Sequence, residues 1–126
     1  MKQIPFYNTR IKGGFWGDRQ KISRNVTVDA VYDRFQETHR FEAIKCDREQ
    51  QVREGWKPHI FWDSDIAKWV EGACYILMRN PDDELRSKVE DIIDDIIKNQ
   101  GDDGYFNVYF TVVDPEARYT DIDCHE

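Results

Sequence analysis

The sequence lacks any long apolar run. No stretch comes near the roughly 18 consecutive apolar residues that a membrane-spanning helix needs, and the opening residues Met1-Lys2-Gln3-Ile4-Pro5 contain no apolar segment of a secretion signal. Cysteine is also scarce. The three cysteines are an odd number without a Cys-x-x-Cys pair, which is not the pattern of a disulfide framework. We therefore expect a cytoplasmic protein with no membrane partner.

Positive charge is in short supply as well. The 126 residues carry a net charge of −7, and residues 55–126 contain seven Lys and Arg against seventeen Asp and Glu. Such an acidic surface repels phosphates, so we expect no nucleic-acid partner. Aromatic residues make up 13% of the chain and include four Trp. That content argues against disorder and predicts a single modest hydrophobic core.

Signatures of several catalytic and cofactor sites are missing. There is no Gly-x-Ser-x-Gly elbow, no glycine loop for phosphate, and no Cys or His pair at metal-ligand spacing. Cys124-His125-Glu126 offers three ligand types in a row. Neighbouring residues rarely share one tetrahedral ion, so we expect no metal bound by this chain.

Two pairs of carboxylates have the residue type that acid–base catalysis needs. Glycoside hydrolysis commonly uses two carboxylates that flank the scissile bond. Asp63 and Asp65 stand at the expected start of a helix, where they would point to different sides and cap free N–H groups. Asp94 and Asp95 lie opposite an apolar helix face and are expected in solvent. The sequence therefore singles out no catalytic residue in this chain.

Hydrophobic periodicity predicts a mainly α-helical chain. Residues 1–17 are expected to form an extended aromatic arm, because Pro5 and the pair Gly13-Gly14 interrupt any period. A first helix with a ragged apolar stripe is predicted over residues 18–41. The polar residues 45–57 have no apolar period and are interpreted as a loop.

The clearest prediction is a helical hairpin over residues 64–99. Its first helix should end near Asn80-Pro81, because proline disfavours helical geometry in the residue before it. The second helix should begin with Asp82 and carry an apolar face made of Leu85, Val89, Ile92, Ile93, Ile96 and Ile97. So short a link makes the two helices antiparallel. Residues 105–113 are rich in aromatic and β-branched residues, which predicts a short strand or an extended aromatic loop.

One segment carries a family resemblance. Pro58-His59-Ile60-Phe61-Trp62-Asp63-Ser64-Asp65-Ile66-Ala67-Lys68-Trp69-Val70-Glu71 resembles glycoside hydrolase family 127, the β-L-arabinofuranosidase-like proteins. Further similar pieces follow the family's order along the chain: Phe15-Trp16-Gly17-Asp18-Arg19, Arg40-Phe41-Glu42-Ala43, Asn80-Pro81-Asp82-Asp83-Glu84-Leu85, Gln100-Gly101-Asp102-Asp103-Gly104-Tyr105-Phe106-Asn107 and Cys124-His125-Glu126. The Trp-Asp-Ser-Asp helix start is the most specific piece, whereas Asp-Gly-Tyr is shared by several helical-barrel glycosidases.

The resemblance implies a fold and a domain layout. It implies the opening helices of an (α/α)6, or six-hairpin, catalytic barrel that is incomplete in this chain. Residues 1–17 would then be an extended aromatic arm, and residues 18–126 the N-terminal part of the barrel. We therefore expect this chain to be the opening part of a longer hydrolase, inactive alone. Its partners would be the rest of the polypeptide, or another copy bound through exposed apolar faces.

The resemblance also implies a chemistry. Family members release terminal L-arabinofuranose from glycans with retention, using a zinc-bound cysteine nucleophile and a glutamate acid/base that match positions beyond residue 126. None of those roles is carried over to Cys46, Cys74 or Cys124. His125 matches a family histidine that contacts the sugar, and an imidazole can donate to or accept from a hydroxyl. His125 is therefore the one substrate-binding residue predicted.

Two alternatives stay open. One is another six-hairpin glycosidase, similar to the unsaturated uronyl hydrolases, which work through carboxylates without zinc. The other is a non-catalytic helical module that uses its acidic face or aromatic arm to bind a partner. A metal-free protein with a paired-Asp site would favour the first, and a monomeric chain that melts cooperatively would favour the second.

Overall fold

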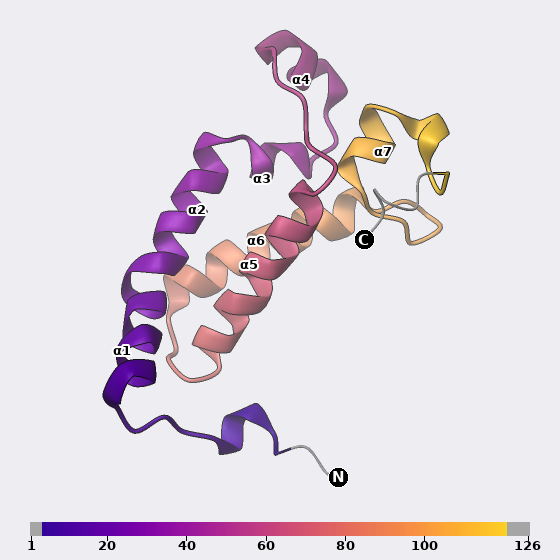
Figure 1. Cartoon of the computed structure of the whole chain (residues 1–126). Coiled ribbons are helices and arrows are strands. Elements are labelled where there is room, and N and C mark those ends of the chain that lie inside the picture. The colour runs from indigo at the N-terminus through magenta and orange to yellow at the C-terminus, as the bar shows by residue number, and fades with distance from the viewer. Residues whose placement is uncertain (1–3, 121–126) are drawn as a thin grey trace.

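The computed structural model describes residues 4–120, and every regular element in that stretch is a helix. Figure 1 shows the elements along the chain. They are η1 (Phe6–Asn8), α1 (Gly14–Ile22), η2 (Ser23–Thr27), α2 (Val28–Glu37), α3 (Arg40–Ala43), α4 (Arg48–Glu54), α5 (Trp62–Leu77), α6 (Asp83–Asn99), α7 (Val108–Val112) and η3 (Pro115–Ala117). The predicted mainly α-helical fold is confirmed.

The first long helical segment passes from α1 through η2, a π-helical turn, into α2. It begins at Gly14, earlier than predicted. It ends at Glu37, because the Thr38 hydroxyl donates to the Arg34 carbonyl at 2.6 Å and His39 takes a left-handed backbone with φ 60°. The predicted range 18–41 was therefore wrong at both ends. A π-helical turn also shifts the phase of side chains along the helix, which explains the ragged apolar stripe.

The predicted hairpin is confirmed as α5 and α6, and it holds the centre of the core. The two helices lie side by side in Figure 1. Asp82 caps α6, since its Oδ1 accepts the Leu85 N–H at 3.0 Å. The buried side chains of the hairpin are Ile66, Trp69, Ala73, Leu85, Val89 and Ile92. Ile97 is 64% exposed, so the described residues leave the last turn of the α6 apolar face uncovered.

Residues 45–57 were predicted to form a loop, and that prediction was wrong because they contain helix α4. Its start is capped by Asp47, whose Oδ1 accepts the Gln50 N–H at 2.9 Å, and Gly55 ends it with φ 75°. Gln51 is 3% exposed, so one face of this short helix packs inward. Seven residues are too few to show a helical period in a polar sequence, and the caps were the usable signal.

The prediction of a strand or extended loop over residues 105–113 was also wrong, because Val108–Val112 form helix α7. Asn107 caps it by accepting the Phe110 N–H at 3.0 Å. Val108, Phe110 and Val112 are all buried. Burial of these side chains outweighs the strand preference of aromatic and β-branched residues.

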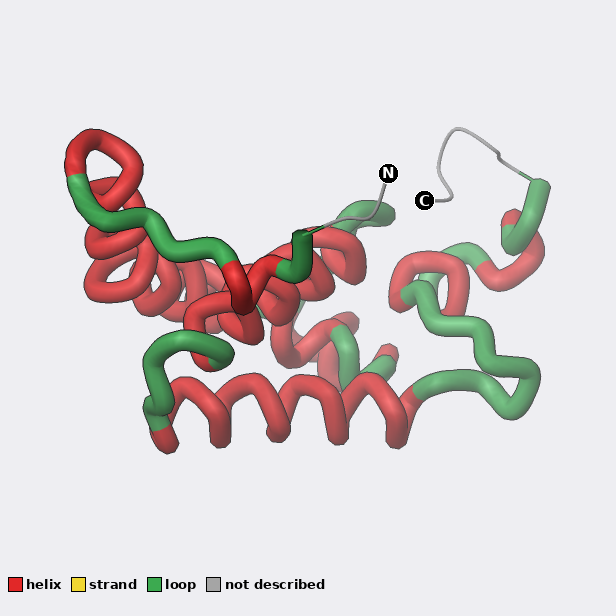
Figure 2. The backbone as a smooth tube through the Cα atoms, turned by 90° about the horizontal axis from the view of Figure 1, so that it is seen from below, coloured by secondary structure: helices red, strands yellow, loops and turns green. Residues whose placement is uncertain are grey.

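The two ends of the hairpin have different neighbours. In Figure 1, α3, α4 and α7 gather near the start of α5, whereas α1 lies near the turn that joins α5 to α6. Figure 2 follows α6 into the loop of residues 100–107, which leads to α7. The start of α5 is therefore the place where segments far apart in sequence meet.

Candidate functional site

The polar residues at the start of α5 make hydrogen bonds to three different parts of the chain. Phe61 is the N-cap of α5 and no side chain caps the helix. Ser64 Oγ donates to the Phe61 carbonyl at 3.0 Å, and Asp65 accepts Arg40 Nε at 3.4 Å. The two carboxylate oxygens of Asp63 accept the Val108 N–H at 3.1 and 3.2 Å. The prediction that Asp63 and Asp65 cap α5 was therefore wrong, since both tie α5 to other segments.

Asp63 is a partly buried carboxyl group with an unusual acidity. Burial raises its pKa from 3.8 to about 6, and the N–H groups of Val108 and of Asp63 itself oppose that rise without cancelling it. A carboxyl group that titrates near neutral pH is a marker of functional sites. The sequence could not single it out, because the α7 residues that cover it lie some 45 positions further along the chain.

Cys46 lies close enough to Asp63 to feel its charge. Burial and, second, the negative charge of Asp63 raise the pKa of the Cys46 thiol to about 11. The thiol is therefore protonated at neutral pH, whereas the thiolate is the form that attacks carbon or binds metal. The Cys46 thiol is therefore a weak nucleophile in this structure.

Arg40 joins the start of α5 to an aromatic layer. Its guanidinium lies over the rings of Trp62, at 5.0 Å, and Phe35, at 5.1 Å. The same group bonds to Asp65 and, at 2.6 Å, to the Thr38 hydroxyl. Arg40 is thus fixed on several sides, and a planar guanidinium suits this combination of stacking and ion pairing.

The aromatic layer continues from Trp62 to His39. The Trp56 ring lies 6.3 Å from that of Trp62, and His39 stacks on Trp56 at 4.9 Å with the planes 4° apart. Trp56 Nε1 donates to Glu54 at 2.9 Å. His39 thus stacks on the Trp56 ring and Arg40 on the Trp62 ring, so this layer joins His39 to the Arg40–Asp65 pair.

A second cluster lies on the segment that follows α6. The Arg118 guanidinium sits 3.5 Å from the Tyr105 ring centroid and 5.0 Å from that of Tyr119, and it pairs with Asp103 at 2.5 Å. Asp103 also accepts the Tyr105 N–H at 3.0 Å. The Asp-Gly-Tyr piece of the sequence is thus held in shape by an arginine fifteen residues beyond Asp103.

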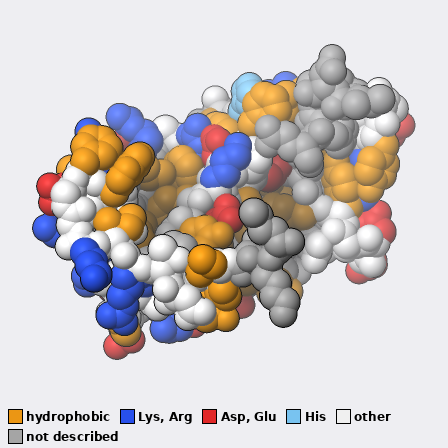
Figure 3. All heavy atoms as spheres, turned by 60° about the horizontal axis from the view of Figure 1, so that its bottom comes forward, with side chains coloured by type: hydrophobic (Ala, Val, Ile, Leu, Met, Phe, Trp, Pro, Cys, Tyr) orange, Lys and Arg blue, Asp and Glu red, His pale blue; other side chains and the backbone are white. Residues whose placement is uncertain are grey.

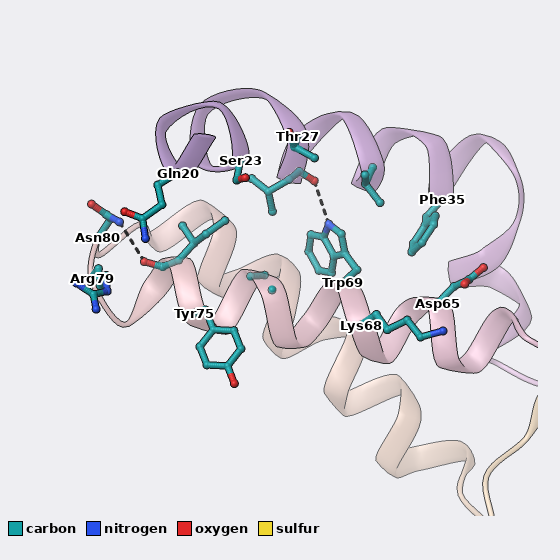
Figure 4. Close-up of a pocket in the computed structure, with 15 residues that line it drawn as sticks. Gln20, Ser23, Thr27, Phe35, Asp65, Lys68, Trp69, Tyr75, Arg79 and Asn80 are labelled. Atoms are coloured by element: carbon teal, nitrogen blue, oxygen red, sulfur yellow. Dashed lines mark hydrogen bonds between the residues drawn. The ribbon is translucent and has the colours of Figure 1, made fainter. Parts of the chain in front are cut away.

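An apolar groove of about 580 Å³ separates α5 from the η2–α2 segment. Figure 4 shows Trp69 pointing into it, with its Nε1 donating to the Val28 carbonyl. Its apolar lining residues are Val28, Val31, Phe35, Trp69, Ala73 and Ile76. Asp65 and Phe35, which contact Arg40 at the start of α5, also line this groove, so the groove and the candidate site share residues.

His125, the predicted sugar contact, lies outside the described residues, as do Cys124 and Glu126. The described part of the chain contains the other family-like pieces. It brings two of them together, since Asp63 of the Trp-Asp-Ser-Asp start bonds to Val108, directly after the piece that ends at Asn107.

Comparison with known proteins decides the family. The family model described as beta-L-arabinofuranosidase, GH127 catalytic domain, matches residues 8–125. The chain belongs to this family. The GH127 resemblance seen in the sequence is thereby confirmed, and it covers every described helix from α1 to α7.

A curated relative agrees with the GH127 match. The non-reducing end beta-L-arabinofuranosidase of Bifidobacterium longum subsp. longum is 38% identical over 53 residues. The matched stretch is 42% of this chain and only 8% of the length of that protein. No solved structure matches the chain significantly.

Zinc can be tested against the residues of this GH127 chain. Among residues 4–120, no three His, Cys, Asp or Glu side chains come together in a group that could hold a metal ion. The described residues therefore do not fit a zinc site. In the same stretch, no helix has the length and apolar character needed to cross a membrane.

Proposed function

We propose that the protein is a glycoside hydrolase that releases terminal L-arabinofuranose from glycans with retention, and that this chain is the N-terminal part of its (α/α)6 barrel. The family match over residues 8–125 carries the proposal. The activity for which the Bifidobacterium relative is named supports the substrate class. The antiparallel α5–α6 hairpin is the kind of unit from which a six-hairpin barrel is built.

We propose that the rest of the polypeptide covers the apolar surface of this chain. Figure 3 shows hydrophobic side chains at the surface, between basic ones, on the face that carries the N-terminal segment. Phe15 and Trp16 of α1 are 63% and 66% exposed. Apolar surface gathered in this way marks an interface. Self-association through the same side chains is the competing explanation.

We propose that zinc and the catalytic residues belong to parts of the protein outside residues 4–120. No catalytic step is assigned to this chain. Its proposed role is to form the opening helices of the barrel and to supply His125 as a contact to the sugar. The cytoplasm remains the proposed compartment, which is compatible with Cys46 and Cys74 both being free thiols.

The decisive experiment uses the full-length protein and 4-nitrophenyl β-L-arabinofuranoside. We expect release of nitrophenol, with retention seen by proton NMR of the first sugar product. The 126-residue chain alone, with zinc added, should release none. An unsaturated uronyl disaccharide serves as the parallel substrate. Hydrolysis of that disaccharide, with the arabinofuranoside left intact, would replace the proposal by the uronyl hydrolase alternative.

Removal of the His125 side chain should weaken hydrolysis by the full-length protein. A lost hydrogen bond to a sugar hydroxyl is worth about 1.4 kcal/mol, so His125→Ala should lower kcat/KM about tenfold. His125→Gln keeps a donor and an acceptor and should recover part of that loss. Asp94→Ala is the control, because it removes an exposed side chain from α6, away from the start of α5. Equal rates for His125→Ala and Asp94→Ala would disprove the sugar contact.

A further inference from the structure

Helix α7 is held in place by side chains of an earlier segment. Asp63 accepts the N–H of Val108, the first residue of α7, and the Arg48 guanidinium donates to the carbonyl of Val112, its last residue. Between them, the Lys57 ammonium lies 4.9 Å from the Tyr109 ring centroid and 3.4 Å from its hydroxyl. Charged groups from the segment 48–63 therefore contact both ends and one side of α7.

These contacts matter because α7 is too short to be stable alone. A helix of five residues forms too few backbone hydrogen bonds to offset the entropy of ordering its first turn. Asn107 caps it, but the N–H of Val108 precedes the donors that this cap satisfies. Asp63 supplies the missing acceptor from another helix. The position of α7 therefore depends on α5. So does the position of the loop of residues 100–107 before it, which we call the Tyr105 loop.

The acceptor of the Val108 N–H is a carboxylate, although a neutral group could make the same hydrogen bond. An asparagine at this position could accept the same N–H without the cost of burying a negative charge. The titratable groups that face Asp63 are Cys46, from the loop before α4, and Tyr105, from the loop before α7, and neither is a cation. Arg40, the nearby cation, is paired with Asp65 instead. The fold thus holds a charge at a junction where that charge is costly.

We propose that Asp63 is a positioning residue of the hydrolase, which acts by holding the first N–H of α7 and so fixing the Tyr105 loop against the start of α5. The inference rests on the proposed function. It adds a residue that acts through the backbone of Val108 and not on the sugar. A shift of about 1 Å caused by a substitution far from the chemistry is enough to lower a catalytic rate substantially.

The test removes the acceptor and the donor of this hydrogen bond separately in the full-length protein. Asp63→Ala removes the acceptor, whereas Asp63→Asn keeps one. Val108→Pro removes the donor at the first helical position, where proline fits, and Asn107 already has the extended backbone that proline requires before it (φ −156°, ψ 119°). Val108→Ala trims the same side chain but keeps the N–H. Asp94→Ala, an exposed carboxylate on α6, is the surface control.

We expect kcat on the arabinofuranoside to fall about tenfold in Asp63→Ala, with a smaller change in KM. Asp63→Asn should stay within about threefold of wild type, because it keeps the hydrogen bond. Val108→Pro should lower kcat more than Val108→Ala does. The double variant Asp63→Ala/Val108→Pro should lower kcat no more than the more damaging single substitution, since both substitutions break the same hydrogen bond. Hydrogen exchange of a peptide covering residues 105–113 should speed up in Asp63→Ala and not in Asp63→Asn.

Three results would overturn the inference. One is an Asp63→Ala variant with the kcat of wild type, when the amount of folded enzyme is determined by circular dichroism. Another is an Asp63→Asn variant as inactive as Asp63→Ala, which would mean that the charge itself acts on the substrate. The third is unchanged exchange of residues 105–113 in Asp63→Ala. A wild-type protein that hydrolyses no arabinofuranoside defeats the proposed function instead, and the exchange measurement still reports whether Asp63 holds α7.

Discussion

Trp69→Ala should remove about 3–5 kcal/mol from the free energy of unfolding of the part of the full-length protein that this chain forms. Trp69 is 7% exposed and its indole N–H donates to the Val28 carbonyl at 2.9 Å. Its ring lies 5.3 Å from that of Tyr32 and 6.0 Å from that of Phe41. The substitution therefore removes a hydrogen bond, two ring contacts and most of the link between α5 and α2. Since small domains are stable by about 5–15 kcal/mol, little cooperative structure should remain.

Urea denaturation followed by far-ultraviolet circular dichroism measures this loss. Trp69→Phe keeps the ring contacts but not the indole N–H, so its midpoint should fall between those of wild type and Trp69→Ala. Val52→Ala is the surface control, because Val52 is 71% exposed and its loss should cost less than about 0.5 kcal/mol. Equal midpoints for the Trp69→Ala and Val52→Ala variants would contradict this account of the core.

The α5–α6 hairpin could be predicted from sequence because its information is local. Each helix is long enough to repeat its apolar spacing several times, and Pro81 and Asp82 mark the turn between them. The short helices α4 and α7 carry no such repeat. Their ends are set by Asp47 and Asn107, and their positions by packing against residues far away in sequence. Strand propensity at residues 105–113 then pointed the wrong way.

The candidate site was harder to predict than the fold for a related reason. A local pattern placed Asp63 at a helix start, where capping is the common role. The helix start was predicted correctly, but Asp63 accepts the N–H of Val108 and does not cap α5. The acidity of Asp63 comes from burial under segments that no spacing rule connects to it. The family, by contrast, was predictable, because the Trp62-Asp63-Ser64-Asp65 piece is a distinctive string of residues wherever its side chains point.

Asp63 should make the chain less stable as the pH rises from about 4 to about 6. Its pKa is raised by burial from 3.8 in the unfolded chain to about 6 in the folded chain, so between these values the folded state holds a proton that the unfolded state has released. Folding therefore favours the protonated form, and its stabilising contribution is complete below about 4 and lost above about 6. A shift of about two pKa units corresponds to at most about 3 kcal/mol, and solvent at the partly exposed carboxyl group reduces it.

Asp63→Asn isolates this contribution, because the amide is uncharged at every pH and still accepts the Val108 N–H. We expect the variant to exceed wild type in unfolding free energy by about 1–3 kcal/mol at pH 7.5 and to match it at pH 4. Urea denaturation of both proteins at the two pH values gives the double difference, in which all other titrating groups cancel. The unfolding free energy of Asp94→Asn, a substitution on the exposed face of α6, should change with pH as that of wild type does. The same pH dependence of the unfolding free energy in Asp63→Asn and wild type would mean that burial does not raise the pKa of Asp63 in the folded chain.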